Sequence, residues 1–304
     1  MAINKVMDFV ELFENNMYHH PLVITELNDP LFIEKKIRID ILRLDLIHPQ
    51  ISGNKWFKLK YNIQEAVNQN ASSILSFGGA YSNHLHALAY AGNLMNFKTI
   101  GFIRGEEVRN ETLDDCRKWG MELHFVSRSE YRKRYDAEYL LEIQEKFKSS
   151  LIVPEGGNNE AGHKGAKEIL KGIDLKKYSH ISTAIGTGAT LTGLIETSFP
   201  MQELIGFVAI KHGEYLEEEI KKNTKNKNWK LMYQYHYGGF AKTTPELVSF
   251  IHDFNNIHQI ELDYVYTGKM MKAIFEMANE NYFTQGSSLL FIHTGGLQGN
   301  RSFK

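Results

Sequence analysis

Short apolar runs rich in β-branched residues recur along the chain from residue 73 onward. Each run is followed by a loop rich in glycine or polar residues, and then by a stretch with apolar positions at helical spacing. This alternation predicts the strand–helix units of a parallel sheet, and runs that are apolar on both faces predict strands covered by helices on two sides. The predicted strands are Ser73 to Phe77, Thr99 to Ile103, Glu122 to Ser127, Leu151 to Pro154, His180 to Ile185, Leu204 to Ile210 and Ser288 to His293.

The length and the charge of the chain limit its class. A chain of 304 residues is long for one compact domain, which favours two lobes with a cleft between them. Lys and Arg number 35 against 36 Asp and Glu, so there is no charge excess to hold a nucleic-acid backbone or an anionic membrane surface. No apolar run approaches the length of a membrane helix. We therefore expect a small-molecule partner, with no nucleic acid and no membrane.

The compartment is indicated by one cysteine and by the first residues. Cys116 is the only cysteine, so no intrachain disulfide can form, which is typical of a reducing compartment. The first fourteen residues include Asp8, Glu11 and Glu14 in place of the basic and apolar segments of a signal peptide. Both observations predict a cytoplasmic protein.

The first segment that suggests chemistry is Ser52-Gly53-Asn54-Lys55, just before a helical stripe that begins at Trp56. Gly53 can adopt backbone angles closed to other residues, and Asn54 is a good helix cap, which places Lys55 in the first helical turn. The helix dipole, the nearby Lys58 and Lys60, and burial would all disfavour a charged ammonium. A neutral amine is what Schiff-base chemistry requires. The alternative is a surface lysine that opens a helix.

A second segment, residues 77–84, runs from a predicted strand into a predicted helix and reads Phe-Gly-Gly-Ala-Tyr-Ser-Asn-His. Ser82, Asn83 and the helix amides would form a group of hydrogen-bond donors suited to a carboxylate. The alternative is an ordinary turn in which Ser82 or Asn83 caps the helix. His84 and His86 point to different faces of a helix and lack accompanying metal ligands, so we expect no metal.

A third segment, Gly186-Thr187-Gly188-Ala189-Thr190, also lies between a predicted strand and a predicted helix. Glycines expose main-chain N–H groups, threonines add hydroxyls, and the helix N-terminus adds positive potential, which together predict a phosphate site. The segment lacks the Lys-Ser/Thr ending of nucleoside-triphosphate sites, and Leu191 stands where a dinucleotide site has its third glycine. A phosphate monoester fits better, and a dinucleotide would also need a ribose-binding acid that neither Glu196 nor Glu203 is well placed to supply.

Two further segments contain tyrosines, and their role depends on context. Tyr266 lies in Asp263-Tyr264-Val265-Tyr266-Thr267-Gly268-Lys269, before an amphipathic stretch, and Tyr237 precedes two glycines. Tyrosines beside a cofactor can stack, steer a substrate or transfer protons. A place in the core or at the surface is the alternative for any one of the fifteen tyrosines in the chain.

Taken in order, these motifs resemble one enzyme family. Gly-Asn-Lys at 53–55, Gly-Gly-x-x-Ser-Asn at 78–83, the Gly/Thr segment at 186–190, Val-Tyr-x-Gly-Lys at 265–269 and His-Thr-Gly-Gly at 293–296 form a specific ordered set. The set resembles the family of 1-aminocyclopropane-1-carboxylate (ACC) deaminase and D-cysteine desulfhydrase, pyridoxal-5′-phosphate (PLP) enzymes of the tryptophan-synthase-β-like fold. The similarity runs from about Arg43 to Gly296.

The resemblance implies a role for each motif at the cofactor. Lys55 would hold PLP as a Schiff base and transfer protons. Asn54 and Asn83 would lie near the oxygen of the cofactor ring, and a hydroxyl from Thr267 or Thr294 would face the ring nitrogen. The phosphate would bind the loop that contains Gly186, Thr187, Gly188, Ala189 and Thr190.

The resemblance also implies how a small amino-acid substrate would bind. Ser82, Asn83 and His84 would take its carboxylate, with Tyr237 and Tyr266 flanking the reacting atoms, so that Lys55, Ser82 and the two tyrosines would be catalytic. His84 stands where relatives commonly have Gln, which would change this pocket.

One departure separates the two activities of the family. Deaminases that open the cyclopropane ring have Glu after the Tyr of the Val-Tyr motif, where this chain has Thr267. A carboxylate there would keep the pyridine nitrogen protonated, and a hydroxyl would not. The main expectation is therefore a lyase or hydrolase like D-cysteine desulfhydrase, which removes an α-proton, eliminates a β-substituent and releases an oxo acid and ammonia. ACC deaminase is one alternative, and a non-catalytic PLP or amino-acid binding protein is another.

The expected architecture is α/β, with two open parallel-sheet lobes and the smaller lobe inserted into the larger. The large PLP-binding domain would comprise residues 1–57 and 155–304, and the small domain residues 58–154. The resemblance also implies a homodimer.

Overall fold

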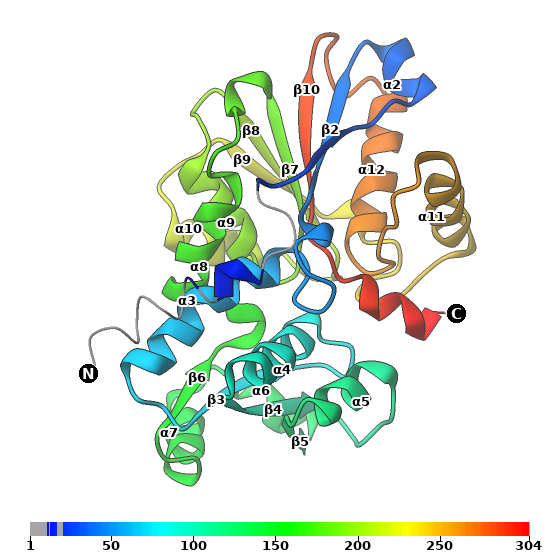
Figure 1. The fold of residues 1–304 in the computed structure, drawn as a ribbon. Coiled ribbons are helices and arrows are strands. Elements are labelled where there is room, and N and C mark those ends of the chain that lie inside the picture. Colours follow the sequence, from blue (N-terminus) through cyan, green and yellow to red (C-terminus); the bar gives the residue numbers. More distant parts are fainter. Residues whose placement is uncertain (1–10, 12, 17–20, 304) are drawn as a thin grey trace.

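The computed structural model describes residues 11, 13–16 and 21–303. They form two sheets of mainly parallel strands with helices packed against them (Figure 1). The α/β fold with two open sheets that the sequence predicts is confirmed. The prediction about a signal peptide falls largely on residues before position 11, outside the described part of the chain.

The strands match the predicted apolar runs to within two residues, and three others appear as well. The strands are β1 (Ile24–Glu26), β2 (Arg38–Arg43), β3 (Ser73–Gly78), β4 (Lys98–Arg104), β5 (Glu122–Val126), β6 (Ser150–Val153), β7 (His180–Ile185), β8 (Glu203–Val208), β9 (Trp229–Met232) and β10 (Ser288–His293). The sequence did not reveal β1, β2 and β9. In β2 the apolar pattern is interrupted by Asp40. This residue is buried and accepts hydrogen bonds from Arg38 and Tyr178.

The helices follow the strands in the expected alternation. They are α2 (Pro30–Lys35), α3 (Asn54–Asn68), α4 (Asn83–Met95), α5 (Glu111–Lys118), α6 (Arg128–Arg132), α7 (Ala137–Lys146), α8 (Glu160–Ala166), α9 (Ala189–Thr197), α10 (Tyr215–Asn223), α11 (Pro245–His258) and α12 (Thr267–Asn279). Short 3₁₀ segments lie between them, among them η1 (Leu44–Leu46), η2 (Glu155–Gly157), η3 (Lys167–Leu170), η4 (Leu175–Lys177), η5 (Gln234–His236) and η6 (Leu297–Phe303).

The larger sheet has the strand order β1-β2-β10-β7-β8-β9, and only β1 is antiparallel to its neighbour. Successive side chains of β10 enter different cores: Leu289 and Phe291 pack with α11 and α12, whereas Leu290 and Ile292 face the core that contains α9. This follows from the two-residue repeat of a strand. Helices therefore cover both faces, and the strands are apolar on both sides as predicted.

The smaller sheet has the order β5-β4-β3-β6 and is entirely parallel. Phe77 and Phe102 pack with Tyr131 and Tyr139 of α6 and α7 on one face. Ile74 and other residues of the opposite face pack with α4 and α5. All strands of this sheet lie within residues 73–153, between segments that build the larger sheet.

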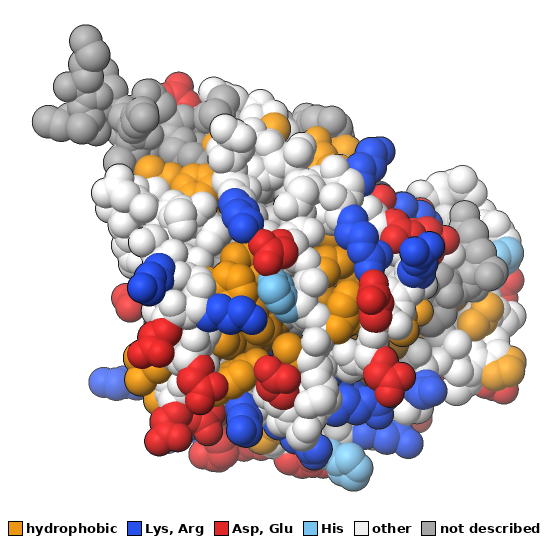
Figure 2. Space-filling model, turned by 90° about the horizontal axis from the view of Figure 1, so that it is seen from below, with side chains coloured by type: hydrophobic (Ala, Val, Ile, Leu, Met, Phe, Trp, Pro, Cys, Tyr) orange, Lys and Arg blue, Asp and Glu red, His pale blue; other side chains and the backbone are white. Residues whose placement is uncertain are grey.

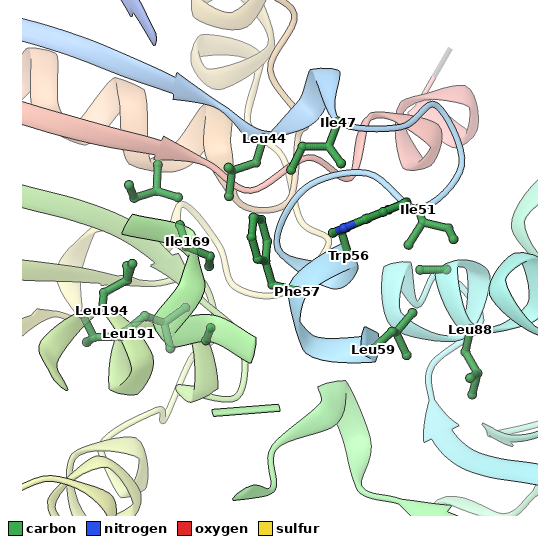
Figure 3. Packing of buried hydrophobic residues seen from close by; sticks show 14 of the residues in the cluster. Leu44, Ile47, Ile51, Trp56, Phe57, Leu59, Leu88, Ile169, Leu191 and Leu194 are labelled. Carbon is green, nitrogen blue, oxygen red and sulfur yellow. The ribbon is translucent and has the colours of Figure 1, made fainter. Parts of the chain in front are cut away.

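Helix α3 packs between the two sheet systems. Figure 3 shows Trp56, Phe57 and Leu59 of α3 between Leu191 of α9 on one side and Leu88 of α4 on the other. One continuous apolar core therefore extends across both halves and fixes the start of α3 between them. The predicted division at residues 57/58 and 154/155 stays a prediction, and α3 continues across the first of these positions.

The surface carries charges of both signs, as the charge balance of the sequence indicates. Figure 2, seen from the end that carries the smaller sheet, shows Lys and Arg intermixed with Asp and Glu, with hydrophobic side chains between them. Among the described residues, no helix combines the length and the apolar character that crossing a membrane requires.

Candidate active site

The loops that follow parallel strands meet between the two sheets. In parallel sheets, the loops after the carboxyl ends of the strands form the usual binding crevice. Here they include the loop after β7, the glycine turn after β10, the loop after β3 and η2 after β6. Four of the five motif segments identified in the sequence fall on these loops or on the start of α3.

Lys55 is brought to the crevice by close backbone packing. Gly53 has a φ of +70° and precedes α3, and a Cβ atom built on it would lie 1.8 Å from the carbonyl oxygen of Thr294. No other residue fits there without displacing the turn after β10. Lys55 is the second residue of α3, so its predicted place in the first helical turn is confirmed.

Asn54 links Lys55 to the Gly/Thr segment. The Lys55 Nζ donates to Asn54 Oδ1 at 2.7 Å, and Asn54 Nδ2 donates to Thr190 Oγ1, also at 2.7 Å. The prediction that Asn54 caps the helix is wrong, because Gly53 holds the cap position and the Asn54 side chain is turned to Thr190. The amine thus lies next to the predicted phosphate site.

Burial lowers the pKa of Lys55 to about 8, and the negative charge of Asp263 opposes part of this shift. A larger fraction of neutral amine is therefore present near neutral pH than for an ordinary lysine. The sequence also invoked Lys60 as a neighbouring charge, but Lys60 is paired with Glu14 and Glu168. Burial is the main cause of the shift.

The Gly/Thr segment has the geometry of an anion site. Gly188, with a φ of +85°, is the cap residue of α9, and its backbone leads directly into Ala189 and Thr190 at the helix N-terminus. The first main-chain N–H groups of a helix have no acceptor within it. The side chain of Thr187 lies against Gly156, where an added Cβ would lie 2.9 Å from it.

A second lysine lies on the same side of α3, one turn after Lys55. Lys58 is buried, and no described residue pairs with its ammonium group. Burial and the charge of Lys55 lower its pKa well below the ordinary value. A Cβ built on Gly157 would be 3.5 Å from Lys58 Cε, and one built on the adjacent Gly156 would be 2.9 Å from Thr187, so Lys58 and the Gly/Thr segment both lie next to η2. An anion between them would satisfy a buried cation.

The side chain of His84 is held as a neutral imidazole. The Ser76 hydroxyl donates to the carbonyl oxygen of Val153 at 2.7 Å, so it accepts from His84 Nε2, 2.9 Å away. His84 Nδ1 is then a buried acceptor without a partner among the described residues. Burial and the two lysines lower the His84 pKa well below its usual value. This side chain offers no donor to a substrate carboxylate, in contrast to the expected role.

Ser82 and Asn83 open α4, as the sequence indicates. Ser82 Oγ accepts from the Leu85 N–H at 3.2 Å and is the N-cap, so the capping alternative holds for this hydroxyl. The main-chain N–H groups of Asn83 and His84 lie in the first turn, where they lack intrahelical acceptors. These amides are the donors that α4 offers a carboxylate. Asn83 Oδ1 accepts from Gln298 Nε2 at 2.7 Å.

The two candidate tyrosines lie in different surroundings. A Cβ built on Gly186 would be 3.2 Å from the Tyr266 hydroxyl, so Tyr266 lies beside the Gly/Thr segment. The Tyr237 hydroxyl donates to Glu276 Oε2 at 2.8 Å, on the second half of α12. Burial, followed by the charges of Asp263 and Glu155, raises the Tyr266 pKa, which keeps this hydroxyl protonated. In this structure Tyr266, and not the Tyr237 hydroxyl, joins the other site residues.

The two candidate threonine hydroxyls also differ. Thr267 Oγ1 donates to Asp263 Oδ2 at 2.7 Å and accepts from the Asp263 N–H at 2.9 Å, so it is fully used in the cap of α12. The Asp263 carboxylate also accepts from the N–H groups of residues 265–267. The Thr294 hydroxyl has no partner among the described residues and lies in the turn that packs on Gly53. Thr294 is thus the free hydroxyl of the pair.

Several residues of the site were not identified from the sequence. They are Gly156, Gly157, Asp263 and Gln298, and Lys58 was noted only as a neighbouring charge. A glycine pair directly after a strand, as in Pro154-Glu155-Gly156-Gly157, was the available signal. Gln298 gave no signal, because its contact with Asn83 joins positions 215 residues apart.

The described part of the chain holds no group of three or more His, Cys, Asp or Glu residues arranged to bind a metal ion. The donors around the site fit PLP. The Lys55 amine, with a lowered pKa, is available for an aldehyde, while a helix N-terminus and the buried Lys58, which no described residue pairs, are available for a phosphate.

Comparisons with known proteins give a consistent result. A family model described as "Pyridoxal-phosphate dependent enzyme" matches residues 25–295. The protein named "Putative 1-aminocyclopropane-1-carboxylate deaminase" of Pyrococcus furiosus is 31% identical over 88% of each chain. The "Bifunctional D-cysteine desulfhydrase/1-aminocyclopropane-1-carboxylate deaminase, mitochondrial" of Arabidopsis thaliana is 27% identical over 85% of this chain and 72% of its own. The crystal structure of an ACC deaminase homologue superposes with a TM-score of 0.79 at 24% identity, covering 96% of each chain, which supports the fold.

Proposed function

The chain belongs to the family of pyridoxal-phosphate dependent enzymes, and from this premise we propose that it eliminates a β-substituent from a small amino acid. D-Cysteine is the substrate that we favour. Loss of the α-proton and of the β-substituent, followed by hydrolysis of the released imino acid, gives an oxo acid, ammonia and, from cysteine, sulfide. Water is consumed in the last step.

The observation that carries the proposal is the environment of Lys55. Its amine has a pKa lowered to about 8 and lies next to Asn54, which is bonded to the Gly/Thr segment. When bound, PLP supplies an electron sink that acidifies the α-proton of an amino acid. Lys55 Nζ would hold the cofactor covalently and could accept the proton of the substrate α-carbon.

Anion binding on two sides would orient the cofactor and the substrate. The N-terminus of α9 and the Lys58 ammonium would hold the phosphate, whose charge would raise the lowered Lys58 pKa again. The first main-chain N–H groups of α4 would hold the substrate carboxylate. The scissile bonds would then lie between the two halves of the molecule, within reach of Lys55.

Tyr266 is the proposed proton donor on the side of the Gly/Thr segment. Its hydroxyl lies close to Gly186, and its raised pKa keeps the proton available near neutral pH. Such a proton could neutralise the thiolate that leaves the β-carbon. The Tyr237 hydroxyl is bonded to Glu276, so we assign it to holding the loop in place.

ACC deamination is the second candidate, favoured by the name of the Pyrococcus furiosus relative. The loop before α12 argues for elimination instead. Thr267 is uncharged, and all four hydrogen bonds of the nearby Asp263 carboxylate are made within the loop. Thr294 is then the hydroxyl that we propose for the pyridine nitrogen, and a hydroxyl does not hold a proton on that nitrogen.

A substrate panel tests the proposal. The purified enzyme with PLP would be incubated with D-cysteine, L-cysteine, D-serine and ACC, while oxo acid, ammonia and sulfide are measured, with Lys55→Ala as the control. We expect oxo acid and sulfide in equal amounts from D-cysteine. Product from ACC alone would favour the second candidate, and no product from any substrate despite bound PLP would favour the binding-protein alternative.

We also propose that the protein is a cytoplasmic homodimer with the division into domains given above. The family resemblance supports the dimer, and the single cysteine, Cys116, supports the compartment. The separate small sheet within residues 73–153 supports the domains. Light scattering of the purified protein would test the dimer directly.

A further inference from the structure

The C-terminal segment η6 lies between the two halves of the molecule. It follows the glycine turn after β10 and lies next to α5 (Figure 1). Asn300 anchors it to the loop before α12: its Nδ2 donates to the Leu262 carbonyl at 3.0 Å, and its Oδ1 accepts from the Tyr264 N–H at 3.3 Å. Segment η6 therefore contacts both halves of the molecule.

Gln298 of η6 fixes the orientation of the Asn83 amide. Gln298 Nε2 donates to Asn83 Oδ1 at 2.7 Å, which leaves Asn83 Nδ2 as a donor with no acceptor among the described residues. On the other side of this amide lies Gly296, where an added Cβ would be 2.5 Å from Asn83 Nδ2. The lack of a side chain at Gly296 leaves room for the Asn83 amide, and the hydrogen bond from Gln298 fixes its orientation.

Arg301 in turn supports Gln298. Its Nε donates to the Gln298 carbonyl at 3.0 Å, and its second terminal nitrogen donates to Asp115 Oδ2 at 2.5 Å. The same carboxylate oxygen is 3.1 Å from Nε2 of the buried His86, one turn after Asn83 on α4. The first turn of α4 is therefore tied to η6 at Asn83 and at His86.

We propose that Gln298 is a positioning residue that makes Asn83 present an N–H, and not an oxygen, to the ring oxygen of PLP. The inference rests on the proposed function and on the place near the oxygen of the cofactor ring that the family resemblance implies for Asn83. Rotation of the amide by half a turn would exchange donor for acceptor and place two oxygens against each other. Because Gln298 is partly exposed, its hydrogen bond contributes little to folding, and its main effect is on the direction of this donor.

The test compares Gln298→Glu with Gln298→Ala. Glu keeps the shape of Gln but cannot donate to Asn83 Oδ1; it would accept from Asn83 Nδ2 and turn the amide the wrong way. In Gln298→Ala, the Asn83 amide can adopt either orientation. We expect Gln298→Glu to weaken PLP binding about tenfold, roughly the effect of one lost hydrogen bond to a ligand, and Gln298→Ala to weaken it less.

Three measurements on the full chain give the answer: PLP affinity by titration of protein freed of cofactor, the absorption of bound PLP as a function of pH, and thermal unfolding. Gln259→Glu is the matched control, because Gln259 is an exposed glutamine that donates to the Asn256 carbonyl away from the site. We expect a shifted pH midpoint of absorption in Gln298→Glu and none in Gln259→Glu.

Two results would overturn the inference in distinguishable ways. If Asn83→Ala changes affinity and absorption but Gln298→Glu does not, or if Ala is more harmful than Glu at position 298, Gln298 does not position Asn83. If neither Asn83→Ala nor Gln298→Glu has an effect, the proposed placement of Asn83 beside PLP is wrong, and the inference falls with it.

Discussion

The starts of α3 and α12 present two lysines with the same lowered pKa and different partners. Burial lowers the pKa of both Lys55 and Lys269 to about 8, and in both Asp263 opposes part of the shift. Lys269 Nζ donates to the carbonyl oxygens of His236 at 2.8 Å and Gly239 at 2.6 Å. Lys55 Nζ donates to the side chain of the preceding residue, Asn54, at 2.7 Å, and to no other described residue.

The difference shows that a lowered pKa does not by itself identify a reactive amine. Lys269 uses two of its three donors on fixed main-chain carbonyls, so its ammonium holds the loop around Tyr237 in place. Lys55 is held by one side-chain amide among the described residues. An amine that must give up its hydrogen bonds in order to react loses less with one partner, as at Lys55, than with two, as at Lys269.

The largest expected effect is that of removing each amine. Lys55→Ala should lower turnover about 10³-fold or more, as expected for loss of a nucleophile and base, and abolish covalent attachment of PLP. Lys269→Ala should keep the attachment and lower the stability of the protein by about 1–3 kcal/mol, because two main-chain carbonyls, of which that of Gly239 is buried, lose their donor. Borohydride reduction with peptide mass mapping would locate the label, and a label on Lys269 in the unmodified protein would reverse the assignment.

The second prediction concerns Lys58, whose buried ammonium group has no partner among residues 11, 13–16 and 21–303. Lys58→Ala should weaken PLP binding about 10- to 100-fold, the range for a lost charged hydrogen bond, and should not destabilise the cofactor-free protein. Lys60→Ala is the control, since Lys60 lies on the same helix but is paired with Glu14 and Glu168. Equal affinities of the two variants, measured by PLP titration, would remove Lys58 from the phosphate site.

The third prediction is a pH dependence with a definite direction. Only the neutral Lys55 amine attacks an aldehyde, so the rate of covalent PLP capture should rise with pH and level off above the Lys55 pKa of about 8. Below that value it should fall about tenfold per pH unit. Borohydride trapping at short times measures the rate. A rate that keeps rising to pH ~10 would indicate an ordinary lysine.

The smallest expected effect separates the two threonine hydroxyls. Thr267→Ala removes a hydroxyl bonded twice to Asp263, and should lower stability to urea by about 1–2 kcal/mol with little change in the absorption of bound PLP. Thr294→Ala should change stability less and should shift the absorption, because none of the described residues bonds this hydroxyl. The opposite pattern would place Thr267 at the cofactor ring.

Local sequence patterns were sufficient for much of the fold and for the position of Lys55. The apolar runs predicted every strand from β3 to β10 except β9, since each is a short buried segment bounded by turn residues. Strand β2 was missed because Asp40, which looks exposed in the sequence, is buried against Tyr178. A pattern reports which residues are polar, but not whether a distant partner makes their burial possible.

Residue types and their spacing along the chain were enough to establish the class of fold, the ordered motifs and the glycine positions that allow close backbone approach. Which polar groups remain free depended on tertiary packing. Thr267 is bonded to Asp263, Tyr237 to Glu276 and Lys269 to two carbonyls, whereas the side chains of Lys58 and Thr294 have no hydrogen-bond partner within the described part of the chain. Hydrogen bonding depends on distance and direction between groups far apart in the chain, and these are fixed only when the two sheets pack around α3.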